Sequence, residues 1–104
     1  MQQYVVYKHK NRKDLLLLVV QSDLLSALAT RLVAPLIKKA NFGVPASRLN
    51  PVFTIGSDAG EEIYVMDTAN LAALSYERFG TKVADLGTNS VEILNAVDFL
   101  LCGF

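Results

Sequence analysis

Few side chains in this sequence could do acid–base or nucleophilic chemistry, and those few are isolated from one another. His9 is the only histidine, so two histidines cannot share a metal ion. It stands between lysines in a charged turn, where we expect it to be solvated and inert. Cys102 is the only cysteine, and no neighbour in the sequence would activate it as a nucleophile. We therefore expect a small buried or interfacial thiol there.

The carboxylates do not suggest a catalytic pair either. Glu61 and Glu62 are adjacent in a predicted strand, so they point to opposite faces of a sheet. Asp67 and Asp85 end predicted strands, where turn and cap roles are usual. The sequence has no glycine-rich phosphate loop, nucleophile elbow or metal-ligand spacing. We predict a protein that binds other molecules without catalysis, metal or cofactor.

Composition indicates one small domain spanning residues 1–104, with 52% hydrophobic residues. Ten basic residues balance ten acidic ones, which does not favour nucleic acid as the main partner. A single cysteine suits the reducing cytoplasm. The longest apolar run, residues 15–20, is far shorter than a membrane helix, which needs about 20 residues. We recognise no signal peptide. We expect a soluble, cytoplasmic protein with no membrane partner.

Short β-branched and aromatic runs predict a series of antiparallel strands, at residues 3–8, 15–21, 31–37, 52–55, 61–66 and 83–86. The charged turn at 8–14 and the turn at 56–60 each predict a hairpin. Because the run at 15–20 is apolar throughout, both of its faces should be covered. Pro35 lies inside a predicted strand, which should therefore be an edge strand or carry a bulge.

For the segments between the predicted strands, the sequence indicates the type of structure less clearly. Residues 26–30 are a weak helix or an irregular crossing, and 38–51 are a long polar surface loop. Residues 67–76 fit either a strand or one helical turn. Residues 79–81, with Gly80, are predicted to turn the chain.

The last fifteen residues predict an amphipathic helix. Asn89 and Glu92 have the spacing of a capping box, and Gly103 is a stop signal. The predicted apolar stripe consists of Ile93, Leu94, Val97, Leu100 and Leu101. The opposite face mixes Glu92, Asn95 and Asp98 with Val91, Phe99 and Cys102. That face is either a protein-docking surface or a cover for another part of the same domain. Strands followed by one C-terminal helix predict a mainly β fold, a small barrel or curled antiparallel sheet with the helix packed on it.

Several short segments, in order, resemble the CcdB toxins of CcdA/CcdB toxin–antitoxin modules. They are Met1-Gln2, Gln21-Ser-Asp-Leu-Leu25, Arg31-Leu-Val-Ala-Pro-Leu36, Pro51-Val-Phe-Thr-Ile-Gly56, Val83-Ala-Asp-Leu86 and the Cys-Gly-Phe tail after a hydrophobic helix. The resemblance runs along the whole chain. It implies an SH3-like, barrel-like sheet with a C-terminal helix, shared with the MazF/Kid ribonuclease toxins.

The resemblance also implies partners. A homodimer would trap DNA gyrase by binding the A subunit of its cleavage complex, and a partly disordered CcdA-like antitoxin would neutralise it. The toxin would contact nucleic acid only as part of a toxin–antitoxin complex bound to operator DNA. Carried over by position, the gyrase-binding residues are Leu24, Leu25, Asp98, Leu101, Cys102, Gly103 and Phe104. Basic residues that could attract an acidic disordered antitoxin are Lys8, Lys10, Arg12, Lys13 and Arg48.

The sequence departs from the family pattern at the tail. Gyrase-poisoning members have tryptophan at the position of Cys102 and asparagine at that of Asp98, so an interface aromatic is lost here. Either Phe104 and Phe99 rebuild the contact, or this member is a non-toxic homologue that retains antitoxin binding. A third alternative is a MazF-like endoribonuclease. Its activity needs basic and acid–base side chains in one groove, and here these would have to be Arg31 and Arg48 with Thr54.

Overall fold

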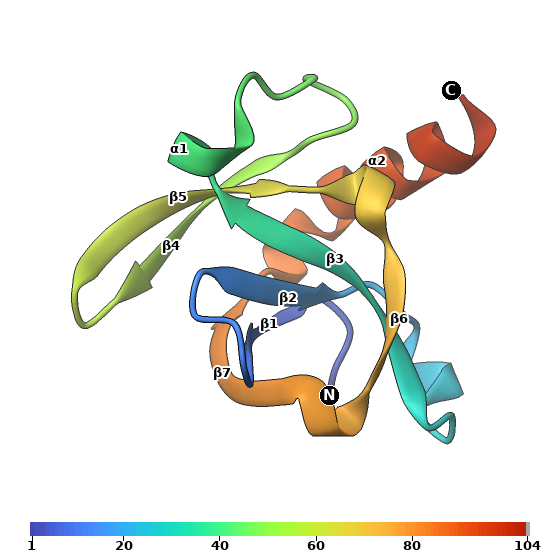
Figure 1. The fold of residues 1–104 in the computed structure, drawn as a ribbon. Helices are drawn as coiled ribbons and strands as arrows, with labels where there is room; N and C mark the ends of the chain where they lie inside the picture. Colours follow the sequence, from blue (N-terminus) through green and yellow to red (C-terminus); the bar gives the residue numbers. More distant parts are fainter. Residues whose placement is uncertain (104) are drawn as a thin grey trace.

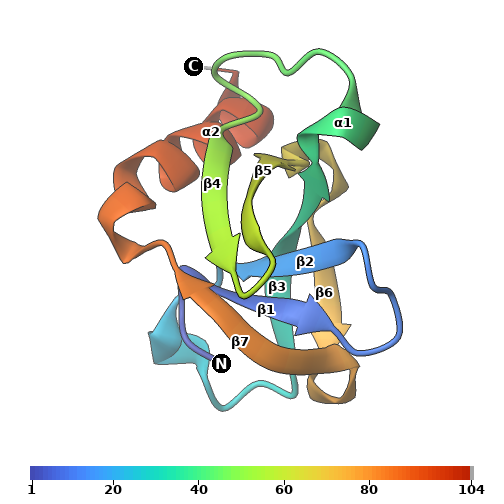
Figure 2. The same ribbon diagram turned by 90° about the vertical axis from the view of Figure 1, so that its left-hand side faces the viewer.

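One antiparallel sheet of seven strands forms most of the molecule and curls on itself like part of a barrel (Figures 1 and 2). The structure is a computed structural model and describes residues 1–103. The strand order is β4-β5-β3-β2-β1-β7, and β6 pairs with the other end of β3. The bounds are β1 Val5–His9, β2 Leu15–Val19, β3 Thr30–Lys38, β4 Val52–Ser57, β5 Gly60–Met66, β6 Ala72–Ser75 and β7 Phe79–Asp85. The predicted mainly β fold with a curled antiparallel sheet is confirmed.

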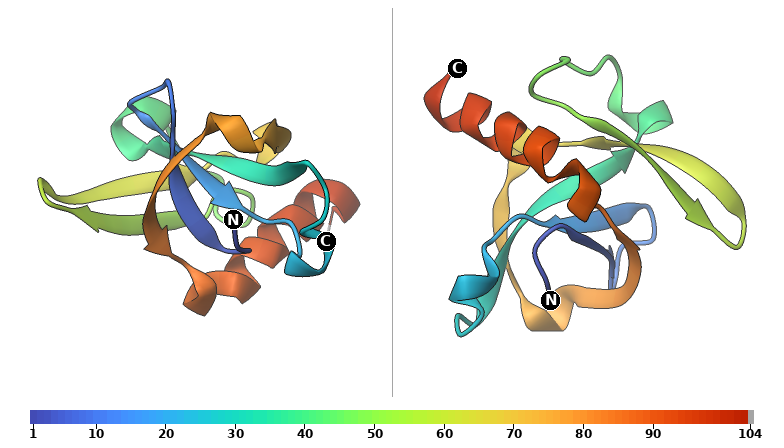
Figure 3. Two further views of the ribbon diagram at one scale, coloured as in Figure 1. Left: turned by 90° about the horizontal axis from the view of Figure 1, so that it is seen from below. Right: turned by 180° about the vertical axis from the view of Figure 1, so that it is seen from behind.

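Helices and 3₁₀ turns connect or cover the strands. They are η1 Asp23–Leu25, α1 Lys39–Phe42, η2 Thr68–Asn70, η3 Tyr76–Arg78, η4 Gly87–Asn89 and α2 Ser90–Cys102. The C-terminal helix α2 crosses one face of the curled sheet, as the rear view in Figure 3 shows. No helix formed by residues 1–103 is both long and apolar enough to span a membrane.

Strand β2 lies at the centre of the core, and all five of its side chains are buried. Successive side chains alternate between the two faces of a strand. Leu16 and Leu18 accordingly join the cluster that contains Ile93 of α2, whereas Leu15 and Leu17 join a second cluster around Phe79. The prediction that both faces of this run are covered is confirmed.

The strand containing Pro35 is central, so the prediction of an edge strand or bulge is wrong. β3 pairs with β2 along one side; along the other, residues 30–33 pair with β6 and residues 36–38 with β5. The ladder therefore changes partner at Pro35, whose carbonyl accepts a hydrogen bond from the N–H of Asp67 at 2.8 Å. A residue's N and C=O face the same side of a strand, so the missing proline N–H falls in this gap and costs no ladder bond.

Residues 79–81 begin β7, so the predicted turn there is wrong as well. Phe79 is buried and meets Tyr7 edge-on, with 5.6 Å between the ring centroids. A Cβ on Gly80 would lie 3.1 Å from the carbonyl oxygen of Lys8. The glycine therefore allows a close approach of two strands, a role that a local pattern cannot distinguish from a turn. The ambiguous segment at 67–76 contains both a 3₁₀ turn, η2, and a strand, β6.

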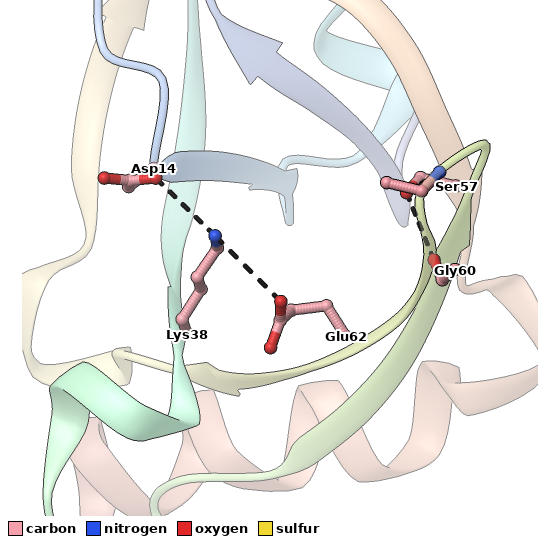
Figure 4. A network of polar contacts seen from close by, with 6 residues as sticks. Asp14, Lys38, Ser57, Gly60 and Glu62 are labelled. Atoms are coloured by element: carbon pink, nitrogen blue, oxygen red, sulfur yellow. Dashed lines mark hydrogen bonds and ion pairs between the residues drawn. The ribbon is translucent and has the colours of Figure 1, made fainter.

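The predicted β4–β5 hairpin is confirmed, and it extends away from the rest of the sheet (Figure 1). Ser57 Oγ donates to the carbonyl of Gly60 at 3.1 Å, closing the turn (Figure 4). At the base of the hairpin, Lys38 Nζ lies 3.6 Å from Asp14 Oδ1 and 4.0 Å from Glu62 Oε1. These partly exposed pairs contribute little stability. They link β3 to the start of β2 and to β5.

The segment predicted as a polar surface loop at 38–51 contains one helical turn, α1, and an irregular remainder. Its end is attached to the sheet. Asn50 is buried, and its side-chain amide donates to the carbonyl of Met66 at 3.0 Å while its Oδ1 accepts from the N–H of Ala46 at 3.0 Å. This attachment positions Arg48 beside α2.

Candidate protein-binding surfaces

The first surface is a loop between β2 and β3, in which Leu24 and Leu25 form the 3₁₀ turn η1. Leu24 is 92% exposed and Leu25 is 52% exposed. Ser22 Oγ accepts a hydrogen bond from the Leu24 N–H at 3.2 Å and so caps the turn. Large apolar side chains thus face solvent on a backbone that is locally fixed.

The second surface is the exposed end of α2. Asp98, Leu101, Cys102 and Gly103 are all exposed, with Leu101 at 70%. Gly103 has a left-handed conformation with φ 75°, and its N–H donates to the Phe99 carbonyl at 2.9 Å. The predicted stop at Gly103 is therefore confirmed. Phe104, the remaining residue of the predicted gyrase-binding set, lies outside the described residues.

The predicted apolar stripe of α2 is buried only in part. Ile93 is fully buried and Val97 packs against the core cluster. In contrast Leu94 is 41% exposed, Leu100 is 37% exposed and Leu101 is more exposed still. For Leu100 and Leu101 the reason is geometric: the helix continues past the edge of the sheet, so its last turns have no core beneath them (Figure 1). The thiol of Cys102 is exposed for the same reason, so this chain does not bury it, and the alternative of an interfacial thiol stays a prediction.

One further prediction for α2 needs correction. Asn89 makes no side-chain capping bond to the helix within residues 1–103, so the predicted capping box with Glu92 is wrong; its Oδ1 instead lies 3.3 Å from Thr88 Oγ1. Sequence reasoning also missed Ala96, which is fully buried three residues after Ile93. Its position one turn from Ile93 was the available signal.

A groove of about 860 Å³ separates α2 from the loop that ends at Pro51. It is lined by Ser47, Arg48, Pro51, Thr88, Asn89, Val91, Glu92, Asn95, Asp98 and Cys102. The guanidinium carbon of Arg48 lies 4.4 Å from the centroid of the Phe99 ring. Hence Phe99 is partly covered from within the domain, whereas Asp98 and Cys102 remain open. The α2 groove joins two predicted gyrase-binding residues to one predicted antitoxin-binding residue.

The other predicted antitoxin-binding residues lie elsewhere. Lys8, Lys10, Arg12 and Lys13 belong to the β1–β2 hairpin, which lies on the opposite side of the molecule from α2 in Figures 2 and 3. The five basic residues therefore do not form one patch in a single chain.

His9, beside these basic residues, is half-buried, which is less exposed than the sequence suggested. Its Nδ1 accepts a hydrogen bond from the N–H of Asn11 at 3.1 Å. Burial, together with the charges of Arg12 and Arg78, lowers the pKa of His9 below its usual value. The imidazole is therefore mainly neutral at pH 7, and the positive charge of the hairpin comes from its lysines and arginines.

The residues named for a ribonuclease are not gathered into a groove. Arg31 is 4% exposed and donates hydrogen bonds to backbone carbonyls. Arg48 stacks on Phe99, and Thr54 lies on β4, outside the α2 groove as the described residues line it. Among the described residues no group of three or more histidine, cysteine or acidic side chains is placed to hold a metal ion.

Comparison with known proteins gives two findings. The family model described as "CcdB protein" matches residues 3–103, nearly the whole chain. Among solved structures, the chain is similar to the Mycobacterium tuberculosis toxin MazF-mt6, with a TM-score of 0.73 and 13% sequence identity. That match covers 93% of this chain and 95% of the other. At this identity the likeness shows a shared fold and carries no information on activity.

Proposed function

Because the chain belongs to the CcdB family, whose members are toxins of toxin–antitoxin systems, we propose that it binds the A subunit of DNA gyrase and poisons the gyrase–DNA cleavage complex. The observation that carries the proposal is the exposure of Leu24 and Leu101, at 92% and 70%, at two positions where the family resemblance puts gyrase contacts. Exposed leucines on fixed backbone are what a protein partner can bury at low entropic cost.

In this proposal the toxin acts by binding alone. Burying a few apolar side chains of the two surfaces against gyrase supplies the affinity. Loss of one central interface side chain typically costs about 2 kcal/mol, roughly thirtyfold in affinity.

The test is DNA cleavage by purified gyrase in the presence of the toxin. We expect the wild-type protein to trap the cleaved complex and Leu101→Ala to need at least a tenfold higher concentration. Ile63→Ala is the matched control, because Ile63 is 41% exposed on the distant β4–β5 hairpin. Equal effects of the two substitutions, or no trapping by any form, would contradict the proposal.

Two further variants separate the alternatives at the tail. Cys102→Trp restores the aromatic side chain of gyrase-poisoning members, and the exposure of Cys102 leaves room for it. Phe104→Ala removes the remaining tail aromatic. Trapping by Cys102→Trp but not by wild type would identify a non-toxic homologue. If all forms leave gyrase untouched while the wild type cuts RNA, the ribonuclease alternative replaces the proposal.

For neutralisation, we propose a CcdA-like antitoxin that is disordered when free. A peptide bound in the α2 groove would contact Arg48 and cover Asp98 and Cys102, so it would compete with gyrase for α2. The basic β1–β2 hairpin would attract acidic segments of the same peptide. Reversing the charge of Lys10, Arg12 and Lys13 should slow antitoxin association at low salt. An unchanged association rate would remove the hairpin from the binding site.

We also propose a symmetric homodimer. Two exposed apolar residues of α2 that lie outside the gyrase set and the α2 groove, Leu94 and Leu100, provide apolar surface that a second copy can cover. Sedimentation at micromolar concentration should then give about 23 kDa, twice the 11.4 kDa of one chain. A mass of one chain under these conditions would contradict the dimer.

A further inference from the structure

The loop between β2 and β3 has an unusual distribution of polarity. We call residues 22–29 the leucine loop, because Leu24, Leu25 and Leu28 are 92%, 52% and 51% exposed. Arg31, the second residue of β3, is 4% exposed. Apolar side chains usually lie inside and arginine outside, so this reversal needs a physical reason.

The buried guanidinium of Arg31 binds the backbone of the leucine loop. Its nitrogens donate to the carbonyls of Ser26 at 2.9 Å, Leu28 at 3.0 Å and Thr30 at 3.0 Å. Nε also donates to the carbonyl of Met1 at 3.3 Å. Within residues 1–103 no carboxylate pairs with Arg31, so backbone carbonyls satisfy the buried charge. Only arginine has enough donors, in a fixed plane, to reach these carbonyls together.

Tyr76, in η3, binds the same two central carbonyls from another part of the chain. Its hydroxyl lies 2.9 Å from the carbonyl oxygen of Leu28 and 3.1 Å from that of Ser26, and it donates to this pair. Its ring lies 4.7 Å from the guanidinium carbon of Arg31. The aromatic ring thus holds the arginine in place while the hydroxyl holds the loop.

Other side chains complete the attachment. Gln21 Nε2 donates to the carbonyl of Leu25 at 3.2 Å, and Asp23 Oδ1 accepts from the N–H of Gln3 at 2.8 Å. Inside the loop, the N–H of Leu28 donates to the Leu25 carbonyl at 3.1 Å. Each of these bonds restricts the backbone, while the leucine side chains remain exposed.

We propose that Arg31 and Tyr76 are positioning residues that fix the leucine loop in its binding conformation, and that Leu28 is a third apolar contact for the gyrase A subunit. This inference rests on the proposed function. Ordering a flexible residue on binding costs conformational entropy, so a loop already ordered in the free protein binds more tightly and associates faster.

The experiment measures two properties of the same variants: amide hydrogen exchange in the loop, and association with the gyrase A subunit. Tyr76→Phe keeps the ring over Arg31 and removes only the hydroxyl; because Tyr76 is 39% exposed, the variant should fold. We expect the amides of Leu25, Ser26 and Leu28 to exchange at least tenfold faster. We also expect gyrase association to be about fivefold slower.

Tyr64→Phe is the matched control and should change neither property, because Tyr64 pairs with Lys38, at the other end of β3 from the loop. Leu28→Ala should weaken gyrase binding at least fivefold without changing exchange. Binding of a CcdA-like antitoxin in the α2 groove should be unaffected by Tyr76→Phe, which separates loop positioning from general loss of stability.

The outcomes distinguish this inference from the proposed function. If the wild-type protein does not bind gyrase, the proposed function fails, and the partner named here fails with it. If the wild type binds but Tyr76→Phe associates at the wild-type rate, the positioning role alone is overturned. Unchanged exchange in Tyr76→Phe would also overturn it, and unchanged gyrase binding in Leu28→Ala would remove Leu28 from the contact.

Discussion

The leucine loop and the end of α2 both present leucines to solvent, but different parts of the molecule hold them in place. In the loop, side chains of Arg31, Tyr76 and Gln21 satisfy the backbone carbonyls. In α2, the helix satisfies its own backbone, and Gly103 ends it. A helix can therefore extend beyond the core with little help, whereas an irregular loop of fixed shape requires side chains from elsewhere.

The difference determines where substitutions should act. For α2, the helix's own Ile93 attaches its first half to the core, and Arg48, although remote in sequence, contacts its second half at the Phe99 ring. For the loop, the important residues are remote, because Tyr76 is 48 positions away from Leu28. The following predictions test this contrast, starting with the largest expected effect.

Ile93→Ala should lower the free energy of unfolding by about 3 kcal/mol, because Ile93 is fully buried and the substitution leaves a cavity. Leu101→Ala should change it by less than about 0.5 kcal/mol, since that side chain is mostly exposed. Urea unfolding of both variants measures the difference. Equal losses would mean that the two halves of α2 are equally anchored, for example by a partner chain.

The two arginine–aromatic contacts should differ in strength. A double-mutant cycle on Arg31 and Tyr76, with Arg31→Met and Tyr76→Leu, should give a coupling of about 2 kcal/mol, because Arg31 is buried and the pair shares the loop carbonyls. The same cycle on Arg48 and Phe99, with Arg48→Met and Phe99→Leu, should give about 0.5 kcal/mol at an exposed site. Couplings of equal size would show that burial does not distinguish the two contacts.

Gly103→Ala should cost about 1 kcal/mol locally, because its φ of 75° is unfavourable for a residue with a Cβ. We expect the amides in the last turn of α2 to exchange faster, and the exchange rates in the leucine loop to stay unchanged. Gly56→Ala is the control, since a Cβ there would meet only Glu61 Cγ at 4.0 Å. Faster exchange in the leucine loop would show that the two surfaces are coupled within one chain.

Local patterns in the sequence were sufficient for much of the fold. The apolar run at 15–20 correctly predicts a strand covered on both faces, and the turn before Gly60 correctly predicts a hairpin. Gly103 correctly predicts the end of the helix. Each of these features depends on residues within a few positions of one another, because side-chain alternation and cap geometry are short-range properties. Motif order along the whole chain likewise predicted the family that the family model confirms.

Tertiary structure alone decided which side chains remain exposed and what surrounds them. Pro35 is tolerated in a central strand because the partner of β3 changes from β6 to β5 beside it. Gly80 permits a close approach of β7 to Lys8. Leu101 is exposed because the sheet ends before the helix does. The buried role of Arg31 depends on a tyrosine 45 positions later in the chain. Burial and hydrogen bonding depend on contacts between distant segments, and no local spacing rule contains that information.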